Sequence, residues 1–347
     1  MKEKIAESII SISASLALPF YRKGIEDSIK ERWMAFGIES SNICNANCSF
    51  CGYGKNMDGR KKSFVDFKVL KHTLDLYQKA GGGDFNFGSI LGDPLADREF
   101  LKKVKFIRSY AAVKRISTFT NLIGLDNFNV EDFVKSGLTD IAVSTAIGDE
   151  KIFKKLFGVD LYHKTMKNIM VLLETNRRLG NPIKIIMLLR TDYDNIADLR
   201  HSEEYRRIRQ FLGEDDITTI EKDEWDDYDG TVKKADLPKY AEFKANPKNK
   251  RIPCYGLYRK VQILKDGEIS MCSCRVSPEL VIDNIFKYDS LTDYWKGERL
   301  NLIRSRWQSG DIPPFCRRCS HYMPYTNLIK GKMRHAILTS LLRRGKC

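Results

Sequence analysis

The sequence predicts an α/β protein built on a parallel sheet, with a small β-hairpin module after it. From Trp33 onward, strand-like apolar runs alternate with helix-like segments, which is typical of βαβ units. The cysteines gather in one group before residue 52 and in another after residue 253. Asp266-Gly267 joins two short strand-like runs, and this dipeptide strongly favours a hairpin.

The composition agrees with such a protein. A chain of 347 residues suits one large domain and a smaller module, and its 42% hydrophobic residues are enough to fill their cores. Nine clustered cysteines without a secretory signal predict a cytoplasmic protein that uses thiolates as metal ligands. The apolar stretch over residues 9–20 is too short to span a bilayer, and charged residues follow it where a small-residue cleavage site would stand.

The formal net charge of +14 suggests an anionic partner. A small-molecule substrate that is phosphorylated or nucleotide-linked, an acidic membrane surface and nucleic acid all fit this charge. The sequence has neither an RNA-reading aromatic motif nor a helix-turn-helix pattern, so we expect no nucleic-acid partner. Charge of this kind is also common on a solvated surface without any partner.

The expected elements follow the chain in order. Residues 1–32 are expected to form one or two helices ahead of the core. Strands are expected over residues 33–39, 84–91, 115–120, 140–144 and 182–190, with another near Thr218. Helices are expected over residues 67–79, 99–110, 149–156, 162–179 and 203–212. A charged stretch then leads to the hairpin and to one helix over residues 290–308.

Cys44, Cys48 and Cys51 follow the first expected strand. A four-iron cluster takes four protein ligands when it only passes electrons, so three thiolates leave one iron open to a second molecule. A structural zinc site usually shows two ligand pairs, and no second pair follows at the usual spacing. A disulfide would leave one cysteine unpaired, and incidental buried thiols are the remaining alternative.

The spacing C-x3-C-x2-C, with Asn45 after the first cysteine and Phe50 before the last, resembles the radical S-adenosylmethionine (radical SAM) superfamily. The resemblance implies a partial (β/α)6 TIM-like barrel and a [4Fe-4S] cluster whose open iron holds SAM. It also implies cleavage of SAM to a 5′-deoxyadenosyl radical that takes a hydrogen atom from the substrate. An external one-electron donor such as flavodoxin or ferredoxin is then needed.

Further residues resemble SAM-binding positions of this family. Gly92-Asp93-Pro94 is similar to a Gly-Glu-Pro stretch at the end of the second strand, with Asp in place of Glu. There, backbone carbonyls line the SAM amino group. Three polar residues at the ends of later strands, where a parallel barrel builds its site, are similar to family contacts to SAM: Asn121, Ser144 and Arg190. An ordinary strand-end polar residue is the alternative for each of these three.

The second thiol group consists of Cys254, Cys272, Cys316 and Cys319. Four thiolates complete either a zinc site or a closed four-iron cluster, and chemistry alone does not choose between them. The pattern C-x17-C followed by C-x2-C resembles the twitch form of the SPASM extension, which implies one auxiliary [4Fe-4S] cluster. Residues 225–230 resemble a segment that precedes this extension, and they either face the substrate or form an ordinary loop.

Two cysteines remain. Cys274 is expected on the same strand face as Cys272, as an alternative ligand, a hydrogen-atom donor or a buried thiol. Arg275 stands where the family often has an acidic residue, so the usual carboxylate proton acceptor is not identified. Cys347 ends a basic tail that is expected to be a surface helix, with peripheral membrane contact as the minority interpretation.

The expected domains are an N-terminal helical extension (1–32), the partial barrel (33–220), a linker (221–250), the twitch-like cluster domain (251–327) and the basic tail (328–347). The expected function is oxidation of an alcohol in a carbohydrate-like substrate, a sugar or aminocyclitol, with electron transfer to the auxiliary cluster. Epimerisation with Cys274 as hydrogen donor and peptide modification are alternatives within the family. A zinc-stabilised nucleic-acid-binding protein is the alternative outside it.

Overall fold

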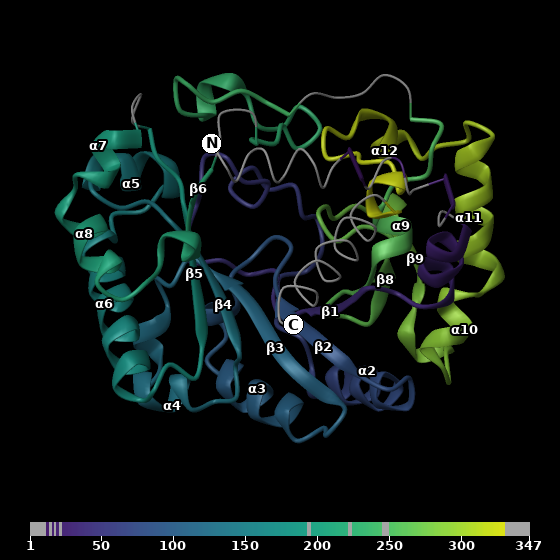
Figure 1. Cartoon of the computed structure of the whole chain (residues 1–347), viewed down its shortest axis with the longest axis horizontal. Helices are drawn as coiled ribbons and strands as arrows, with labels where there is room; N and C mark the ends of the chain where they lie inside the picture. Colours follow the sequence, from purple (N-terminus) through teal and green to yellow (C-terminus); the bar gives the residue numbers. More distant parts are fainter. Residues whose placement is uncertain are drawn as a thin grey trace.

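Figure 1 shows the chain as a computed structural model. It describes residues 12–13, 16, 19–20, 23–192, 196–220, 224–244 and 250–329. The expected basic tail beyond Ile329, including Cys347, lies outside the described residues, and so do residues 1–11.

One open sheet of nine strands runs through the molecule (Figure 1). Its order is β6-β5-β4-β3-β2-β1-β7-β8-β9, and the pairs from β6 to β7 are all parallel. The barrel strands are β1 (Ala35–Glu39), β2 (Gly83–Gly88), β3 (Val113–Thr120), β4 (Asp140–Thr145), β5 (Lys184–Leu189) and β6 (Ile217–Thr219). Six parallel strands that do not close confirm the partial barrel.

Helices cover the outer face of this sheet (Figure 1). They are α2 (Phe67–Lys79), α3 (Phe100–Arg108), α4 (Val130–Val134), α5 (Glu150–Phe157), α6 (Tyr162–Arg178), α7 (Ile196–Arg200) and α8 (Glu203–Arg209). Residues 23–31 are also helical. Strand residues that face the helices are fully buried apolar side chains, such as Ile38, Phe87 and Val143, whereas the other face carries polar residues.

Local chemistry fixes the ends of two of these helices. The Asp66 side chain accepts a hydrogen bond from the Lys68 amide at 2.6 Å at the start of α2. Asp149 does the same for two amides at the start of α5. Gly158 ends α5 in the left-handed conformation, with φ of 68°, which suits glycine. Its Cβ position would lie 2.2 Å from the Asn47 carbonyl, so this turn also supports the cysteine loop.

The C-terminal part contains α9 (Gly256–Arg259), β7 (Lys260–Ile263), β8 (Glu268–Ser270), β9 (Val281–Asn284), α10 (Leu291–Trp295), α11 (Glu298–Gln308) and α12 (Pro314–Arg318). The hairpin at Asp266-Gly267 joins β7 to β8 as predicted. The sequence did not predict β9. Expecting one helix over residues 290–308 was wrong, because the chain breaks at Gly297, whose added Cβ would lie 2.4 Å from the Asp293 carbonyl.

Short 3-10 turns complete the structure, at Pro94–Ala96, Leu125–Asn127, Glu214–Asp216, Lys234–Asp236, Pro278–Leu280 and Ile285–Lys287. The charged stretch before the hairpin has a small core of its own, made of Trp225, Val232, Leu237 and Ala241. Within the described residues, we find no helix with the length and apolar character needed to cross a bilayer.

Candidate active site

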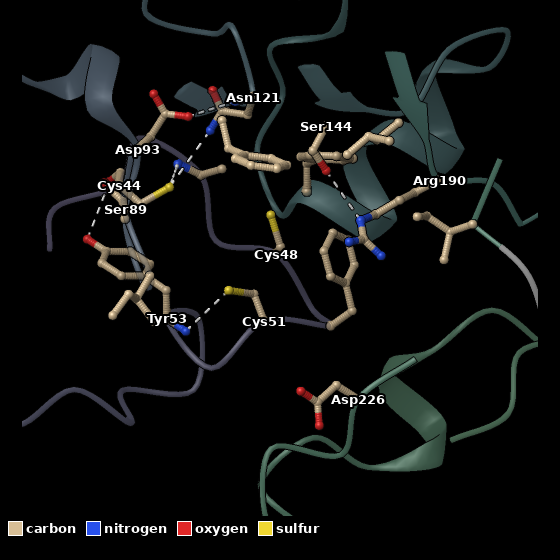
Figure 2. Close-up of a pocket in the computed structure, with 18 of the residues that line it drawn as sticks. Cys44, Cys48, Cys51, Tyr53, Ser89, Asp93, Asn121, Ser144, Arg190 and Asp226 are labelled. Atoms are coloured by element: carbon tan, nitrogen blue, oxygen red, sulfur yellow. Dashed lines mark hydrogen bonds between the residues drawn. The ribbon is translucent and has the colours of Figure 1, made fainter. Parts of the chain in front are cut away.

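The cysteine loop after β1 lines a cavity of about 600 Å³ (Figure 2). Figure 2 shows the side chains of Cys44, Cys48 and Cys51 around one open space, with Asp93 and Asn121 beside Cys44. Two backbone amides donate to the loop's sulfurs, Ala46 to Cys44 at 3.4 Å and Tyr53 to Cys51 at 3.5 Å. Amide donors of this kind are typical of thiolate ligands in iron–sulfur sites.

Burial shapes the chemistry of these thiols. Burial and the nearby Asp93 carboxylate raise the pKa of Cys44 to about 12, and burial also raises the pKa of Cys48 and of Cys51. Thiols that are this reluctant to ionise in the metal-free protein become thiolates when a cationic metal centre binds them. Their shared cavity and their amide donors therefore fit a cluster ligand set.

Gly92-Asp93-Pro94 lies against the start of the cysteine loop. A Cβ on Gly92 would lie 2.7 Å from the Ser41 carbonyl, so only glycine allows this approach. The Asp93 amide donates to the Ile43 carbonyl at 2.8 Å. These contacts hold the strand end of β2 against the residues that precede Cys44.

The Asp93 side chain points into the protein. Its carboxylate accepts hydrogen bonds from the Thr120 hydroxyl at 3.0 Å and from the amides of Asn121 at 2.7 Å and Leu95 at 2.9 Å. Burial raises the pKa of Asp93 to about 6, although these donors oppose the shift. The carboxylate thus positions the end of β3 and does not face the cavity with a free oxygen.

Asn121 connects that network to the cysteine loop. Its side-chain nitrogen donates to Asn45 Oδ1 at 2.7 Å and lies 3.8 Å from Cys44 Sγ, and its oxygen accepts from the Ile123 amide at 2.9 Å. The sequence suggested Asn121 as a SAM contact. In the structure its amide group is committed to the loop that carries Cys44.

Ser144 and Arg190 meet at the other side of the cavity (Figure 2). Arg190 Nε donates to the Ser144 hydroxyl at 3.4 Å, and the guanidinium lies over the rings of Phe50 at 4.3 Å and Trp225 at 5.1 Å. Burial lowers the pKa of Arg190, but an arginine stays charged. A fixed cation therefore faces the cavity beside the cysteine loop.

The second thiol group lines a smaller cavity of about 40 Å³. Cys254, Cys272, Cys316 and Cys319 all border it, and burial raises the pKa of Cys254 to about 11. The buried ammonium of Lys250 donates to the carbonyls of Cys316 at 3.2 Å and Cys319 at 2.6 Å, and to the intervening Arg317 carbonyl at 2.9 Å. This lysine holds the turn that carries two of the four thiols.

These thiol positions suit a cluster ligand set, because four thiols border one small cavity and a four-iron cluster takes one protein thiolate on each coordinated iron.

Cys274 borders the same small cavity and does not line the large one. The expectation that it shares a strand face with Cys272 was wrong, because β8 ends at Ser270 and both cysteines follow in a loop. The Cys274 amide donates to Cys272 Sγ at 3.4 Å, and the Tyr255 hydroxyl lies 3.9 Å from Cys274 Sγ.

A group of four charged or titratable residues lies between the two thiol sites, and we call it the inter-site wall: Asp226, Lys244, Arg275 and His321. Asp226 is paired with the buried Arg275 guanidinium, and its Oδ2 lies 2.9 Å from His321 Nε2. His321 Nδ1 lies 3.5 Å from Lys244 Nζ. Asp226, Lys244 and His321 line the large cavity, and Arg275 and His321 line the small one.

Burial would raise the pKa of Asp226, but the hydrogen bond from His321 and the charge of Arg275 hold that pKa well below its usual value. Sequence reasoning noted the acidic 225–230 segment and the position of Arg275, but it did not join them and did not notice His321 or Lys244. The carboxylate that pairs with Arg275 thus comes from Asp226, in another segment of the chain.

An open parallel barrel with one three-thiol site and one auxiliary thiol site defines an iron–sulfur enzyme scaffold. The Radical SAM superfamily model matches residues 38–201, and the model of the SPASM iron–sulfur cluster-binding domain matches residues 254–320. The chain belongs to the radical SAM superfamily and carries a C-terminal SPASM domain. Its cofactors are a SAM-binding [4Fe-4S] cluster, S-adenosylmethionine and an auxiliary iron–sulfur centre.

Curated relatives include the GTP 3′,8-cyclases of Vibrio vulnificus strain YJ016 and of Haemophilus influenzae strain Rd. The first is 22% identical over 146 residues, 42% of this chain and 43% of the relative. The second is 22% identical over 144 residues, 41% of this chain and 42% of the relative. The matched region thus spans less than half the length of these relatives.

Solved structures with a similar fold include BtrN in complex with AdoMet and 2-DOIA, with a TM-score of 0.52 and 13% identity over 83% of this chain and 93% of BtrN. The structure of anSMEcpe with bound AdoMet gives a TM-score of 0.55 and 13% identity over 91% of this chain and 96% of anSMEcpe. Streptococcus suis SuiB bound to precursor peptide SuiA gives a TM-score of 0.54 and 18% identity over 84% of this chain and 72% of SuiB. At these identities the likeness concerns the fold alone.

Proposed function

We propose that this radical SAM enzyme oxidises an alcohol of a carbohydrate-like substrate, a sugar or aminocyclitol, and passes the second electron to one auxiliary [4Fe-4S] cluster. When bound, the first cluster and SAM supply the one-electron chemistry that removes a hydrogen atom from a substrate C–H bond. Oxidation to a ketone then needs the loss of one further electron and of the hydroxyl proton.

The observation that carries this proposal is the inter-site wall. His321 borders both cavities, so a substrate in the large cavity lies against the partition that leads to the auxiliary thiols. The His321 ring stands on that partition, where a ring nitrogen can take up the hydroxyl proton, and the Asp226 carboxylate 2.9 Å from its Nε2 can stabilise the charged ring. An electron acceptor and a proton acceptor are then on the same side of the substrate.

Epimerisation is the second candidate within the family, because Cys274 is present. Its thiol borders the auxiliary cavity and is absent from the lining of the large one, so it lies on the wrong side of the wall to give a hydrogen atom to the substrate. This placement favours oxidation. Peptide modification has no specific contact in its favour, and the family match removes the zinc-stabilised nucleic-acid-binding alternative.

The test starts with iron, sulfide and 5′-deoxyadenosine measured after anaerobic reconstitution with SAM and a chemical reductant. About eight irons per chain are expected, and about four in a variant with Cys44, Cys48 and Cys51 all changed to Ala, which should form no deoxyadenosine. Retained deoxyadenosine formation in that variant would refute the assignment of the SAM cluster.

Sugars and aminocyclitols are then screened in D2O with product mass analysis. Oxidation removes two hydrogens from the substrate, whereas epimerisation by an exchangeable thiol leaves one deuterium in the product. Deuterium incorporation without net oxidation would contradict the proposed reaction and support the epimerase. A SAM-cleaving enzyme that modifies none of these compounds would overturn the substrate class alone.

A further inference from the structure

We infer that the substrate carries an anionic oxygen group, a phosphate or a carboxylate, and that Lys244 binds it in the large cavity. This inference rests on the proposed function in one respect, that the large cavity is where the substrate lies. It adds a binding residue and a required chemical group to that site.

The backbone fixes Lys244 beside the cysteine loop. Its amide donates to the Trp225 carbonyl at 2.8 Å, next to a β-bridge between Trp225 and Phe243. The Trp225 ring packs edge-on against Phe50, with ring centroids 5.5 Å apart, and Phe50 precedes Cys51. A half-buried lysine on a backbone held in this way extends into the cavity from a defined position.

The charge of Lys244 is not balanced inside the described part of the protein. Its ammonium has one polar neighbour there, His321 Nδ1 at 3.5 Å, and no carboxylate within ion-pair distance. Asp226 does not balance the Lys244 charge, because its oxygens already pair with Arg275 and His321. Glu224 also borders the cavity, but its side chain is exposed to solvent.

The other cation of the cavity has a different place. Arg190 is enclosed by Phe50 and Trp225 and donates to Ser144, at the ends of β4 and β5 beside the thiols. That position suits the SAM side of the cavity, as the family resemblance suggests. Lys244 enters from the wall that faces the auxiliary site, so among the described residues that line the cavity it is the cation left for the substrate.

The ligand chemistry follows from the side chain. An ammonium is a compact point charge with three donors, and it binds phosphate or carboxylate oxygens without the flat two-point geometry of arginine. A neutral polyol would leave this cation half-buried and unpaired, which is unfavourable. The curated relatives are named for a reaction on GTP, a phosphorylated nucleotide, in line with this class.

The experiment measures anion binding to the reconstituted enzyme with SAM by titration calorimetry, using pyrophosphate, malonate and the neutral polyol inositol. The variants are Lys244→Gln and Lys244→Arg, with Lys239→Gln as control, an exposed lysine in the same segment. We expect Lys244→Gln to weaken binding of one anion by about ten-fold or more, Lys239→Gln to leave it unchanged, and Lys244→Arg to retain part of it. The affinity for inositol should be the same in the wild type and in Lys244→Gln.

Tighter pyrophosphate binding assigns a phosphate, and tighter malonate binding assigns a carboxylate. The inference is overturned if the wild-type enzyme binds neither anion, or if Lys244→Gln binds both as the wild type does. Iron content and deoxyadenosine formation are measured on the same preparations. A wild-type enzyme without iron or without deoxyadenosine formation would count against the proposed function. The calorimetric result tests Lys244 separately, because anion binding requires no turnover.

Discussion

Changing Asp226 to Asn is expected to destabilise the protein strongly. Arg275 and Asp226 are only 2% and 8% exposed, and Asn would leave the guanidinium buried without its counter-charge. Breaking a buried ion pair from one side costs about 3–5 kcal/mol. With an unfolding entropy of about 2.1 cal/mol/K per residue, this predicts a fall of about 4–7 °C in the thermal midpoint of the whole chain.

The same segment offers a matched control in Asp229. Its carboxylate pairs with Arg318 through contacts of 2.7 and 2.8 Å, but the arginine side chain is 58% exposed. Asp229→Asn should therefore lower the thermal midpoint much less than Asp226→Asn does. Thermal scans of the reconstituted proteins at one scan rate, with iron content checked for each, give the comparison.

The pH dependence supplies a second arm for the Asp226 prediction. Because the folded-state pKa of Asp226 is lowered, its stabilising effect is complete above the unfolded-state pKa of about 3.9 and is lost as the pH falls toward the folded value. The gap between wild type and Asp226→Asn should thus be present at neutral pH and should narrow as the pH falls below about 3.9. Equal midpoints for Asp226→Asn and Asp229→Asn would refute the reasoning.

Three other changes test the two thiol sites. Lys250→Met removes three hydrogen bonds to the turn of Cys316 and Cys319. It should lower the iron content by about four per chain without abolishing deoxyadenosine formation. An unchanged iron content would show that the turn keeps its conformation without Lys250. Asn121→Leu removes the amide donor beside Cys44 Sγ and should lower the reduction potential of the SAM cluster in an EPR-monitored titration, whereas an unchanged potential would assign Asn121 to loop structure alone. Cys274→Ser should keep both SAM cleavage and the oxidised product, and a changed product would return Cys274 to a catalytic role.

The strand ends were the most predictable part of the molecule. Short strand-like runs that alternate with helical segments locate parallel strands, and their carboxyl ends share one edge, so Asn121, Ser144 and Arg190 were expected near the cysteine loop. All three line the same cavity as the three thiols. Whether each contacts SAM stays a prediction, and Asn121 already has protein partners on both atoms of its amide.

The inter-site wall was beyond the reach of sequence patterns. Arg275 and Asp226 are 49 residues apart in the chain, and Ser320 reaches Asp226 across 94 residues. Neither separation follows a helix or strand period, because these contacts depend on how a non-repetitive segment folds over the cavity. The strand β9 was missed for a related reason, since a run of four residues carries too little alternation to be recognised.

The pairing of β7 with β1 joins the segments that carry the two thiol groups in one sheet. β1 leads toward Cys44 at its carboxyl end, whereas Cys254 and Cys272 flank the opposite end of the β7–β8 hairpin, and the shared strand of five residues rises about 16 Å. A sheet ladder cannot slip by one residue without turning its inward side chains outward. The register between β1 and β7 therefore keeps the loops at the two ends of this strand pair from sliding past each other, so the auxiliary thiols cannot shift along the sheet relative to the cysteine loop.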